Sequence, residues 1–105
     1  MRVASAFARI VRIRMPRVMV LFENTAGGGS TLGGTLDQLA ALISAVETSC
    51  PALQLGVCLD TAHLFASGID LRSPEHVKKL VVDIRATIGA RRVKLIHCND
   101  SRAAC

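Results

Sequence analysis

The sequence predicts an α/β fold in which about three parallel strands alternate with helices. Two observations lead to this prediction. Three short, almost continuous apolar runs, residues 17–23, 54–59 and 92–98, have the length and composition of strands that are buried on both faces. Segments with apolar residues at helical spacing precede the first run and separate the others. Strands joined by helices of this length are parallel neighbours with right-handed crossovers.

The composition is that of a folded chain rich in apolar residues. The chain has 105 residues, half of them apolar, and a net charge of +5. It is too apolar to be disordered, and rather apolar for a free-standing small domain, which exposes much surface for its volume. No apolar run approaches the roughly 20 residues that span a bilayer, and arginines interrupt the start of the chain where a secretory signal would be apolar. We therefore expect a cytoplasmic piece of one larger domain, without an internal boundary in residues 1–105 and without a membrane partner.

The charge and the cysteines constrain the partners only weakly. The basic excess comes mostly from the first segment, so it is weak evidence for binding to nucleic acid. An acid-free, arginine-rich start can also imitate a mitochondrial presequence, although a helix of a larger fold explains it as well. The four cysteines show no C-x-x-C spacing, which favours reduced thiols over a disulfide framework. They are Cys50, Cys58, Cys98 and Cys105, and the second and third lie inside predicted strands, where a reduced cysteine behaves as a small apolar residue.

The first third of the chain predicts a helix, a strand and a long loop. Residues 3–13 place apolar side chains on one side of a helix and arginines on the other, and Pro16 ends this helix. The strand at residues 17–23 follows and ends on Glu23. The glycine-rich loop at residues 24–34 is longer than a simple connector needs to be.

The middle of the chain predicts a second helix and a second strand. A threonine at the N-cap and a glutamine three residues later form a capping box at residues 35–38. The helix that follows continues to about Glu47. The strand at residues 54–59 comes next, and the loop after it carries Asp60 and His63.

The last third predicts a third helix and a third strand. Ser, Pro and Glu at residues 73–75 are typical of a helix start, and Gly89 ends the helix. The expected apolar stripe of this helix consists of Val77, Leu80, Val81, Ile84 and Ile88. The strand at residues 92–98 contains His97 near its end.

Acidic and imidazole side chains follow all three predicted strands. Glu23, Asp60 and His97 stand at the carboxyl ends of the strands, and His63 lies three residues beyond Asp60. Neighbouring parallel strands lie about 4.8 Å apart, so these groups can converge. Two carboxylates and two imidazoles suit zinc or manganese, and a central Glu23 could bridge two ions. Taken singly, an acid at a strand end can instead be a helix cap, and a histidine in a strand can be a hydrogen-bonded core residue.

Three further features have more than one interpretation. The glycines at residues 27–29 could cradle phosphate with their backbone amides, but no Gly-Lys-Ser/Thr follows them as in a P-loop. Asn99 and Asp100 could support metal ligands or form a simple turn. His76, early in the third helix, is expected on the surface.

Three stretches of the chain resemble signatures of the endonuclease IV family, the deoxyribonuclease IV or family-2 abasic-site endonuclease group. Residues 21–34, 56–70 and 96–101 are similar to its Glu-Asn-Thr-Ala-Gly, Asp-Thr-x-His-x-Phe-x-x-Gly and His-x-Asn-Asp motifs, in the same order and spacing. The family folds as an eight-stranded TIM (β/α)8 barrel with three zinc ions. The resemblance runs from Val18 to Ser101 and implies a partial TIM barrel that contains strands five, six and seven.

The resemblance also implies roles for four residues. Glu23 corresponds to the carboxylate that bridges two zinc ions, which makes it the candidate catalytic residue. Asp60 and His97 correspond to ligands of the second zinc, and His63 to a ligand of the third. Gly28 stands where the family commonly has glutamine. The family's histidines of strands three and four, its later Asp-x-His ligands and its glutamate of strand eight have no counterpart in this chain, so four ligand positions are present and five are absent.

The expected function of the complete family enzyme is zinc-dependent hydrolysis of DNA in base-excision repair, on the 5′ side of abasic sites in double-stranded DNA. Manganese is an alternative ion. Clustered metals would stabilise the attacking and leaving oxygens, and the damaged nucleotide would leave the base stack. The sequence leaves open whether the chain alone is an enzyme, and its oligomeric state. Two alternatives are a sugar isomerase or epimerase of the xylose-isomerase-like barrels, which the motif combination disfavours, and a non-catalytic truncated remnant.

Overall fold

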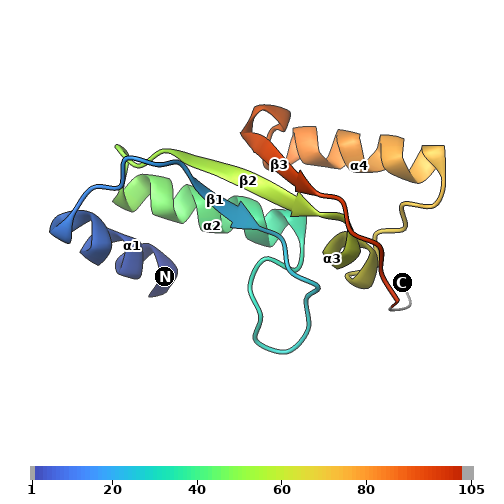
Figure 1. Ribbon diagram of the computed structural model, residues 1–105, viewed down its shortest axis with the longest axis horizontal. Helices are drawn as coiled ribbons and strands as arrows, with labels where there is room; N and C mark the ends of the chain where they lie inside the picture. The colour runs from blue at the N-terminus through green and yellow to red at the C-terminus, as the bar shows by residue number, and fades with distance from the viewer. Residues whose placement is uncertain (1, 103–105) are drawn as a thin grey trace.

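The computed structural model describes residues 2–102, in which helices alternate with three strands (Figure 1). The elements are α1 (Arg2–Ile13), β1 (Val20–Glu23), α2 (Leu36–Ser49), β2 (Leu55–Asp60), α3 (Thr61–Ala66), α4 (Pro74–Ala86), the 3-10 turn η1 (Ala90–Arg92) and β3 (Val93–His97). This order confirms the predicted α/β alternation. None of these helices is both long and apolar enough to cross a membrane.

The three strands form one parallel sheet in the order β1-β2-β3. Glu23 at the end of β1 pairs with Cys58 of β2, and Asp60 at the end of β2 pairs with His97 of β3. A register shift beside Cys58 inserts one extra residue into β3. All three strands end at the same edge of the sheet, where the glycine-rich loop and α3 also lie (Figure 1).

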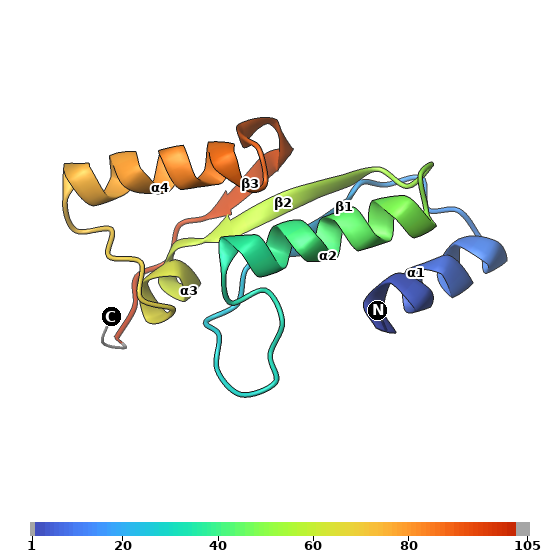
Figure 2. The same cartoon turned by 180° about the vertical axis from the view of Figure 1, so that it is seen from behind.

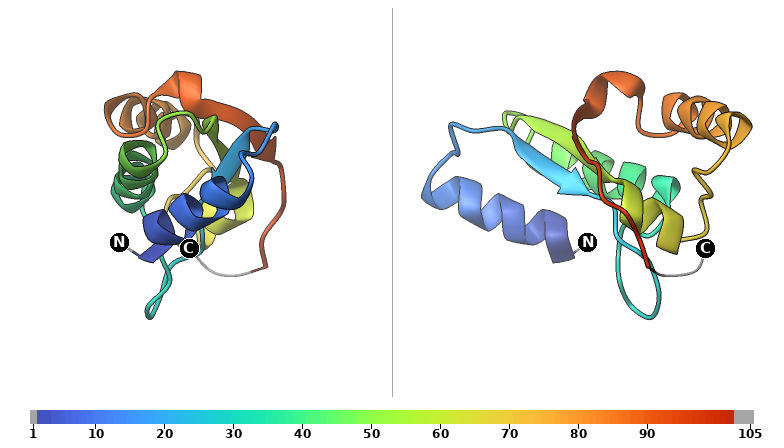
Figure 3. Two further views of the ribbon diagram at one scale, coloured as in Figure 1. Left: turned by 90° about the vertical axis from the view of Figure 1, so that its left-hand side faces the viewer. Right: turned by 45° about the vertical axis from the view of Figure 1, so that its right-hand side comes forward.

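Helices cover one face of this sheet. α2 and α4 lie together behind the strands in Figure 1 and in front of them in Figure 2, and the left view of Figure 3 shows the two layers edge-on. The main core lies between these layers, where Val57 and Leu59 of β2 pack with side chains of both helices, which include Leu39 and Ile84. Successive strand residues point to opposite faces, so Cys58 and its neighbours at positions 56 and 60 point to the face that α2 and α4 leave bare.

A smaller core fixes α1 against the second half of α2. Ala4 packs there with Val46, Cys50 and Leu53, and Phe7 meets Phe22 of β1 edge to face with ring centroids 5.5 Å apart. The amphipathic pattern of the first helix therefore places its apolar side against the protein, as the sequence predicts.

Two predictions about the elements are wrong, the start of the first strand and the loop after the second. The first strand starts at Val20 and not at residue 17, because β2 offers pairing partners only from Leu55 onward. Residues 61–66, predicted as loop, form the short helix α3 directly after β2. The carboxylate of Asp60 accepts the backbone N–H of His63 and so caps this helix. Six residues are too few to show a helical period in sequence.

Part of the apolar surface is uncovered. Leu80, Ile84 and Ile88 of the predicted stripe are buried, but Val77 and Val81 are exposed. β3 is the least covered strand, with Leu95 46% and Ile96 59% exposed. His76 lies on the surface as expected. The described cysteines are free: Cys50 and Cys58 are buried, Cys98 is exposed, and Cys105 lies outside the described residues.

Candidate metal centre

The structure brings Glu23, Asp60, His63 and His97 together where the strands end. Oε1 of Glu23 lies 3.1 Å from Nδ1 of His97 and 3.7 Å from Nδ1 of His63. The carboxylate of Asp60 lies 3.8 Å from Nδ1 of His97 and 4.0 Å from Nδ1 of His63. Each strand contributes one of these groups, and the first turn of α3 contributes His63. The sheet register alone therefore accounts for the convergence of three of them.

Asp60 forms the base of this cluster. Its side chain is only 6% exposed, whereas those of Glu23, His63 and His97 are 37–45% exposed. The backbone N–H of His63 and the side-chain amide of Asn99 donate to its two oxygens, at 3.0 and 2.8 Å. The hydrogen bond from His63 is the main cause that lowers the pKa of Asp60, and burial opposes it. Asp60 is therefore an ionised carboxylate at neutral pH.

Hydrogen bonds set the orientation of both imidazole rings. Nδ1 of His63 lies 2.9 Å from the backbone oxygen of Asn24. A carbonyl oxygen only accepts, so a neutral His63 carries its proton on Nδ1 and leaves the lone pair on Nε2 free. Nδ1 of His97 lies 3.1 Å from the Glu23 carboxylate. Histidines that bind metals in proteins are commonly oriented by such a second contact.

Asn24 is a supporting residue that the sequence reasoning missed. Its side chain is buried, accepts the backbone N–H of Asp60 at 2.7 Å and donates to the backbone oxygen of Asp60 at 3.2 Å. The amide thus continues the ladder between β1 and β2 by one more pair. The only signal in the sequence was an amide directly after a strand-end acid, which the prediction assigned to the loop.

The segment after β3 also supports the cluster. Thr61 accepts the backbone N–H of Asn99 at 2.9 Å and donates to its backbone oxygen at 2.7 Å. Of the two interpretations of Asn99 and Asp100, the structure places Asn99 against Asp60. Asp100 accepts the backbone N–H of Ser101 at 2.8 Å.

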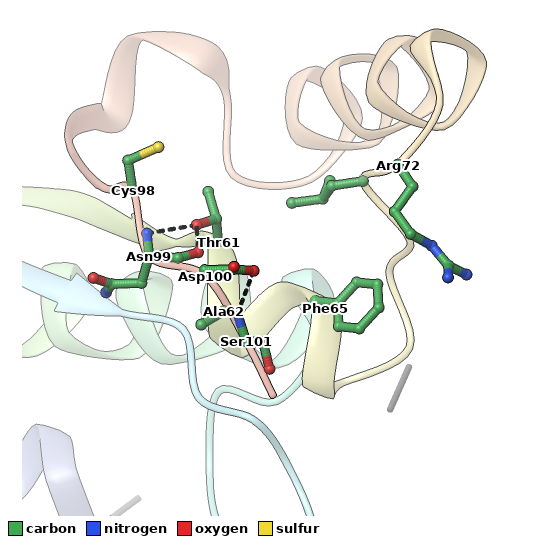
Figure 4. Close-up of a pocket in the computed structure, with 9 residues that line it drawn as sticks. Thr61, Ala62, Phe65, Arg72, Cys98, Asn99, Asp100 and Ser101 are labelled. Atoms are coloured by element: carbon green, nitrogen blue, oxygen red, sulfur yellow. Dashed lines mark hydrogen bonds between the residues drawn. The ribbon is translucent and has the colours of Figure 1, made fainter. Parts of the chain in front are cut away.

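A hollow of about 380 Å³ lies beside the cluster, between α3 and the segment after β3 (Figure 4). Its lining consists of Thr61, Ala62, Phe65, Leu71, Arg72, Cys98, Asn99, Asp100 and Ser101. None of the four candidate ligands lines it. Thr61 and Asn99, joined in Figure 4 by a hydrogen bond, belong both to its wall and to the support of Asp60.

The donor set of the cluster fits a divalent metal ion. Ligand atoms of Glu23, Asp60 and His63 all lie within 4.8 Å of one another. Carboxylate oxygens and imidazole nitrogens together suit zinc and manganese. Three of the four side chains are partly open to solvent, so an ion can enter from the bare face of the sheet.

The glycine-rich loop, the candidate phosphate cradle, stands next to this edge. Thr25 joins the two ends of this loop. Its backbone N–H donates to the backbone oxygen of Gly33 at 3.0 Å, and its hydroxyl donates to the backbone oxygen of Leu32 at 2.9 Å. Residues 26–29 line a hollow of about 500 Å³ together with Gln38 and Ser67. The arrangement leaves room for a ligand, and no described side chain with a positive charge lines it.

Comparisons with known proteins agree with the geometry. A model of the family described as xylose isomerase-like TIM barrel matches residues 1–105. The crystal structure of endonuclease IV from Thermus thermophilus superposes with a TM-score of 0.79 at 32% sequence identity. The match covers 98% of this chain and 36% of the Thermus chain. The partial resemblance to endonuclease IV expected from the sequence is thereby confirmed.

Proposed function

Because this chain belongs to the xylose isomerase-like TIM barrel family, we propose that it supplies part of a metal centre of the endonuclease IV type, which hydrolyses phosphodiester bonds in DNA. The observation that carries this proposal is the convergence of Glu23, Asp60, His63 and His97 at the carboxyl edge of a parallel sheet. In TIM barrels this edge is where catalytic residues gather. The likeness to a Thermus protein named endonuclease IV supports the choice of reaction.

Residues 1–105 are proposed to be one piece of a single barrel domain. The match covers nearly all of this chain but only 36% of the Thermus chain. β1 and β3 each have one unpaired side in the described sheet, which a closed barrel does not leave. The exposed Leu95 and Ile96 of β3 would be covered by further elements of such a barrel.

The four clustered residues would hold the metal ions. Glu23, the most central, would bridge two of them, Asp60 and His97 would bind one, and His63 would bind another. Zinc supplies Lewis-acid polarisation of a phosphodiester and activation of water. The chain itself holds Asp60 ionised through two hydrogen bonds and orients His63 through Asn24. These contacts fix the ligands before an ion arrives, which is what a reaction that depends on metal placement requires.

The proposed substrate is double-stranded DNA with an abasic site, cleaved on its 5′ side. The support is the motif set in this chain, Glu-Asn-Thr-Ala-Gly at residues 23–27, Asp-Thr-Ala-His at 60–63 and His-Cys-Asn-Asp at 97–100, together with the Thermus likeness. A missing base lowers the cost of turning the nucleotide out of the stack toward the metals. Manganese is a second candidate ion, because the described oxygen and nitrogen donors suit it as well.

A chimera tests this proposal. The segment of the Thermus protein that superposes on this chain is replaced by residues 1–105, and a labelled duplex with one abasic site is incubated with the product. We expect metal-dependent cleavage, and a loss of at least about 100-fold on Glu23→Gln, because a neutral amide bridges two dications poorly. His76→Gln, a surface change, is the control. A folded, metal-loaded chimera that does not cleave, or that cleaves equally well with Glu23→Gln, would overturn the proposal.

A further inference from the structure

Cys58 differs from the other buried cysteine in what surrounds it. Cys50 packs in the small core with Ala4 and Val46, as a cysteine that acts as a small apolar residue does. Cys58 is equally buried, at 3% exposure, but belongs to neither apolar core. It lies on β2 between two core residues, and strand alternation turns its thiol to the opposite face of the sheet.

On that face the thiol meets two of the candidate metal ligands. Glu23 is the direct register partner of Cys58, across the β1–β2 ladder. The sulfur, a carboxylate oxygen of Glu23 and a ring nitrogen of His97 all lie within 4.8 Å of one another. These are the three donor types of mixed zinc sites in proteins. A purely structural position in the sheet requires no carboxylate and no imidazole beside a buried thiol, so this grouping points to a ligand set.

We infer that Cys58, Glu23 and His97 form a second, sulfur-containing metal site beneath the oxygen and nitrogen site, for thiophilic divalent ions such as cadmium, cobalt or zinc. The ion replaces the thiol proton, which passes to the buffer, and no electron is transferred. The inference rests on the proposed metal centre only through the shared Glu23 and His97. Because both sites use Glu23, an ion in the sulfur site competes with the one that Glu23 would bridge.

The two sites differ in the ions they favour. Thiolate ligands select soft ions, whereas manganese prefers carboxylate and water oxygens. Cadmium is therefore expected at Cys58, and manganese at the carboxylates of Glu23 and Asp60. Excess cadmium displaces manganese from the chain through the shared carboxylate, and Cys58→Ser weakens that displacement while it leaves manganese binding unchanged.

Cobalt spectroscopy tests the sulfur site directly. In the 105-residue chain with Cys50→Ala, Cys98→Ser and Cys105→Ser, Cys58 is the only thiol left. Added Co²⁺ is expected to give an intense sulfur-to-cobalt charge-transfer band in the near ultraviolet, and the further change Cys58→Ser should abolish it. Cadmium affinity, measured by displacement of bound cobalt, should fall by at least about 10-fold in the serine variant. Loss of even a contact that supports a ligand lowers metal affinity by that factor.

The outcomes separate this inference from the proposed function. Visible cobalt bands without a sulfur charge-transfer band would overturn the role of Cys58 and leave the oxygen and nitrogen site in place. No cobalt binding at all would overturn the sulfur site, whereas the proposed function is decided separately by cleavage with the chimera. If the serine variant does not fold, zinc-edge X-ray absorption of the chain that keeps Cys58 and Cys50 but has Cys98→Ser and Cys105→Ser gives the answer. A zinc–sulfur distance of about 2.3 Å supports the inference, and a shell of nitrogen and oxygen alone overturns it.

Discussion

At the scale of single residues, Asp60 illustrates how one side chain can serve the fold and the site together. One of its oxygens caps α3, and the other accepts the side-chain amide of Asn99, just after the neighbouring strand β3. Its backbone is paired by the side chain of Asn24. Asp60 is thus held through its backbone by Asn24 and through its carboxylate by α3 and Asn99, and this carboxylate lies 3.8 Å from Nδ1 of His97.

Asn24→Ala tests how far the fixed position of Asp60 depends on the side-chain amide of Asn24. The change leaves the buried N–H and C=O of Asp60 without partners, which should cost about 1–3 kcal/mol of folding free energy. Thermal or urea unfolding measures this loss, and zinc affinity should fall with it because Asp60 is no longer fixed. Asn99→Ala is the matched control, since it removes one hydrogen bond to the same carboxylate but leaves the backbone paired. Equal stabilities of the two variants would contradict the role given to Asn24.

At the scale of elements, the connection between α3 and α4 is held by a local ion pair. Arg72 reaches back to Asp70 with its backbone N–H and two guanidinium nitrogens, at 2.8–2.9 Å, and its guanidinium lies 5.4 Å from the ring centroid of Phe65. The side-chain hydrogen bonds from Arg72 lower the pKa of Asp70 to about 2. These contacts within the connection therefore favour an ionised Asp70.

The stability of the chain should respond to acid through this residue. An aspartate in an unfolded chain has a pKa of about 3.9, and the folded value is lower, so Asp70 contributes stability above about pH 4 that is lost as the pH falls through about 2. Asp70→Asn should lower the unfolding midpoint at neutral pH, and the difference from the unmodified chain should shrink below pH 4. A difference that stays constant down to pH 2 would contradict this. Asp37→Asn, on an exposed helix start, serves as the control.

The elements also show what the sequence could and could not predict. The sequence was enough to predict α2 and α4, from the capping residues Thr35 and Ser73 and from the helical spacing of apolar residues. The positions of Glu23, Asp60 and His97 at strand ends were enough to expect them at one edge of the sheet. α3 was not predicted because six residues, about a turn and a half, are too few to show a repeating pattern of apolar residues. The role of Asn24 escaped for another reason: its partner lies 36 residues away, and the contact exists only once the register between β1 and β2 is set.

At the scale of the whole molecule, one face of the sheet is covered by helices and the other is not. α2 and α4 close one side over the main core (Figure 2), while the side that carries the candidate ligands is bare. Apolar side chains remain open on β3 and on α4, where Val82 is 60% exposed. Exposed edges and apolar patches of this kind promote association between chains.

The 105-residue chain by itself should not cleave abasic DNA. By the proposed assignment, one ion would have Glu23, Asp60 and His97, a second only Glu23, and a third only His63. Zinc sites in proteins generally need at least three protein ligands, so only the first ion has enough. Its ligands stand on a sheet whose outer strands lack a partner on one side, and catalysis by several metals needs them fixed within about 0.5 Å.

The assay uses the purified chain, zinc or manganese, and a labelled duplex with one abasic site, with Glu23→Gln as the matched control. Cleavage by the unmodified chain should not exceed that of the control, while equilibrium dialysis should show at most one bound zinc per chain that Glu23→Gln weakens. Sedimentation run alongside reports whether chains associate through the open edges of the sheet. Cleavage well above the control by an oligomer would mean that copies of the chain complete one another's sites. The same cleavage by a monomer would mean that four ligands on three strands suffice. Either result would refute the prediction.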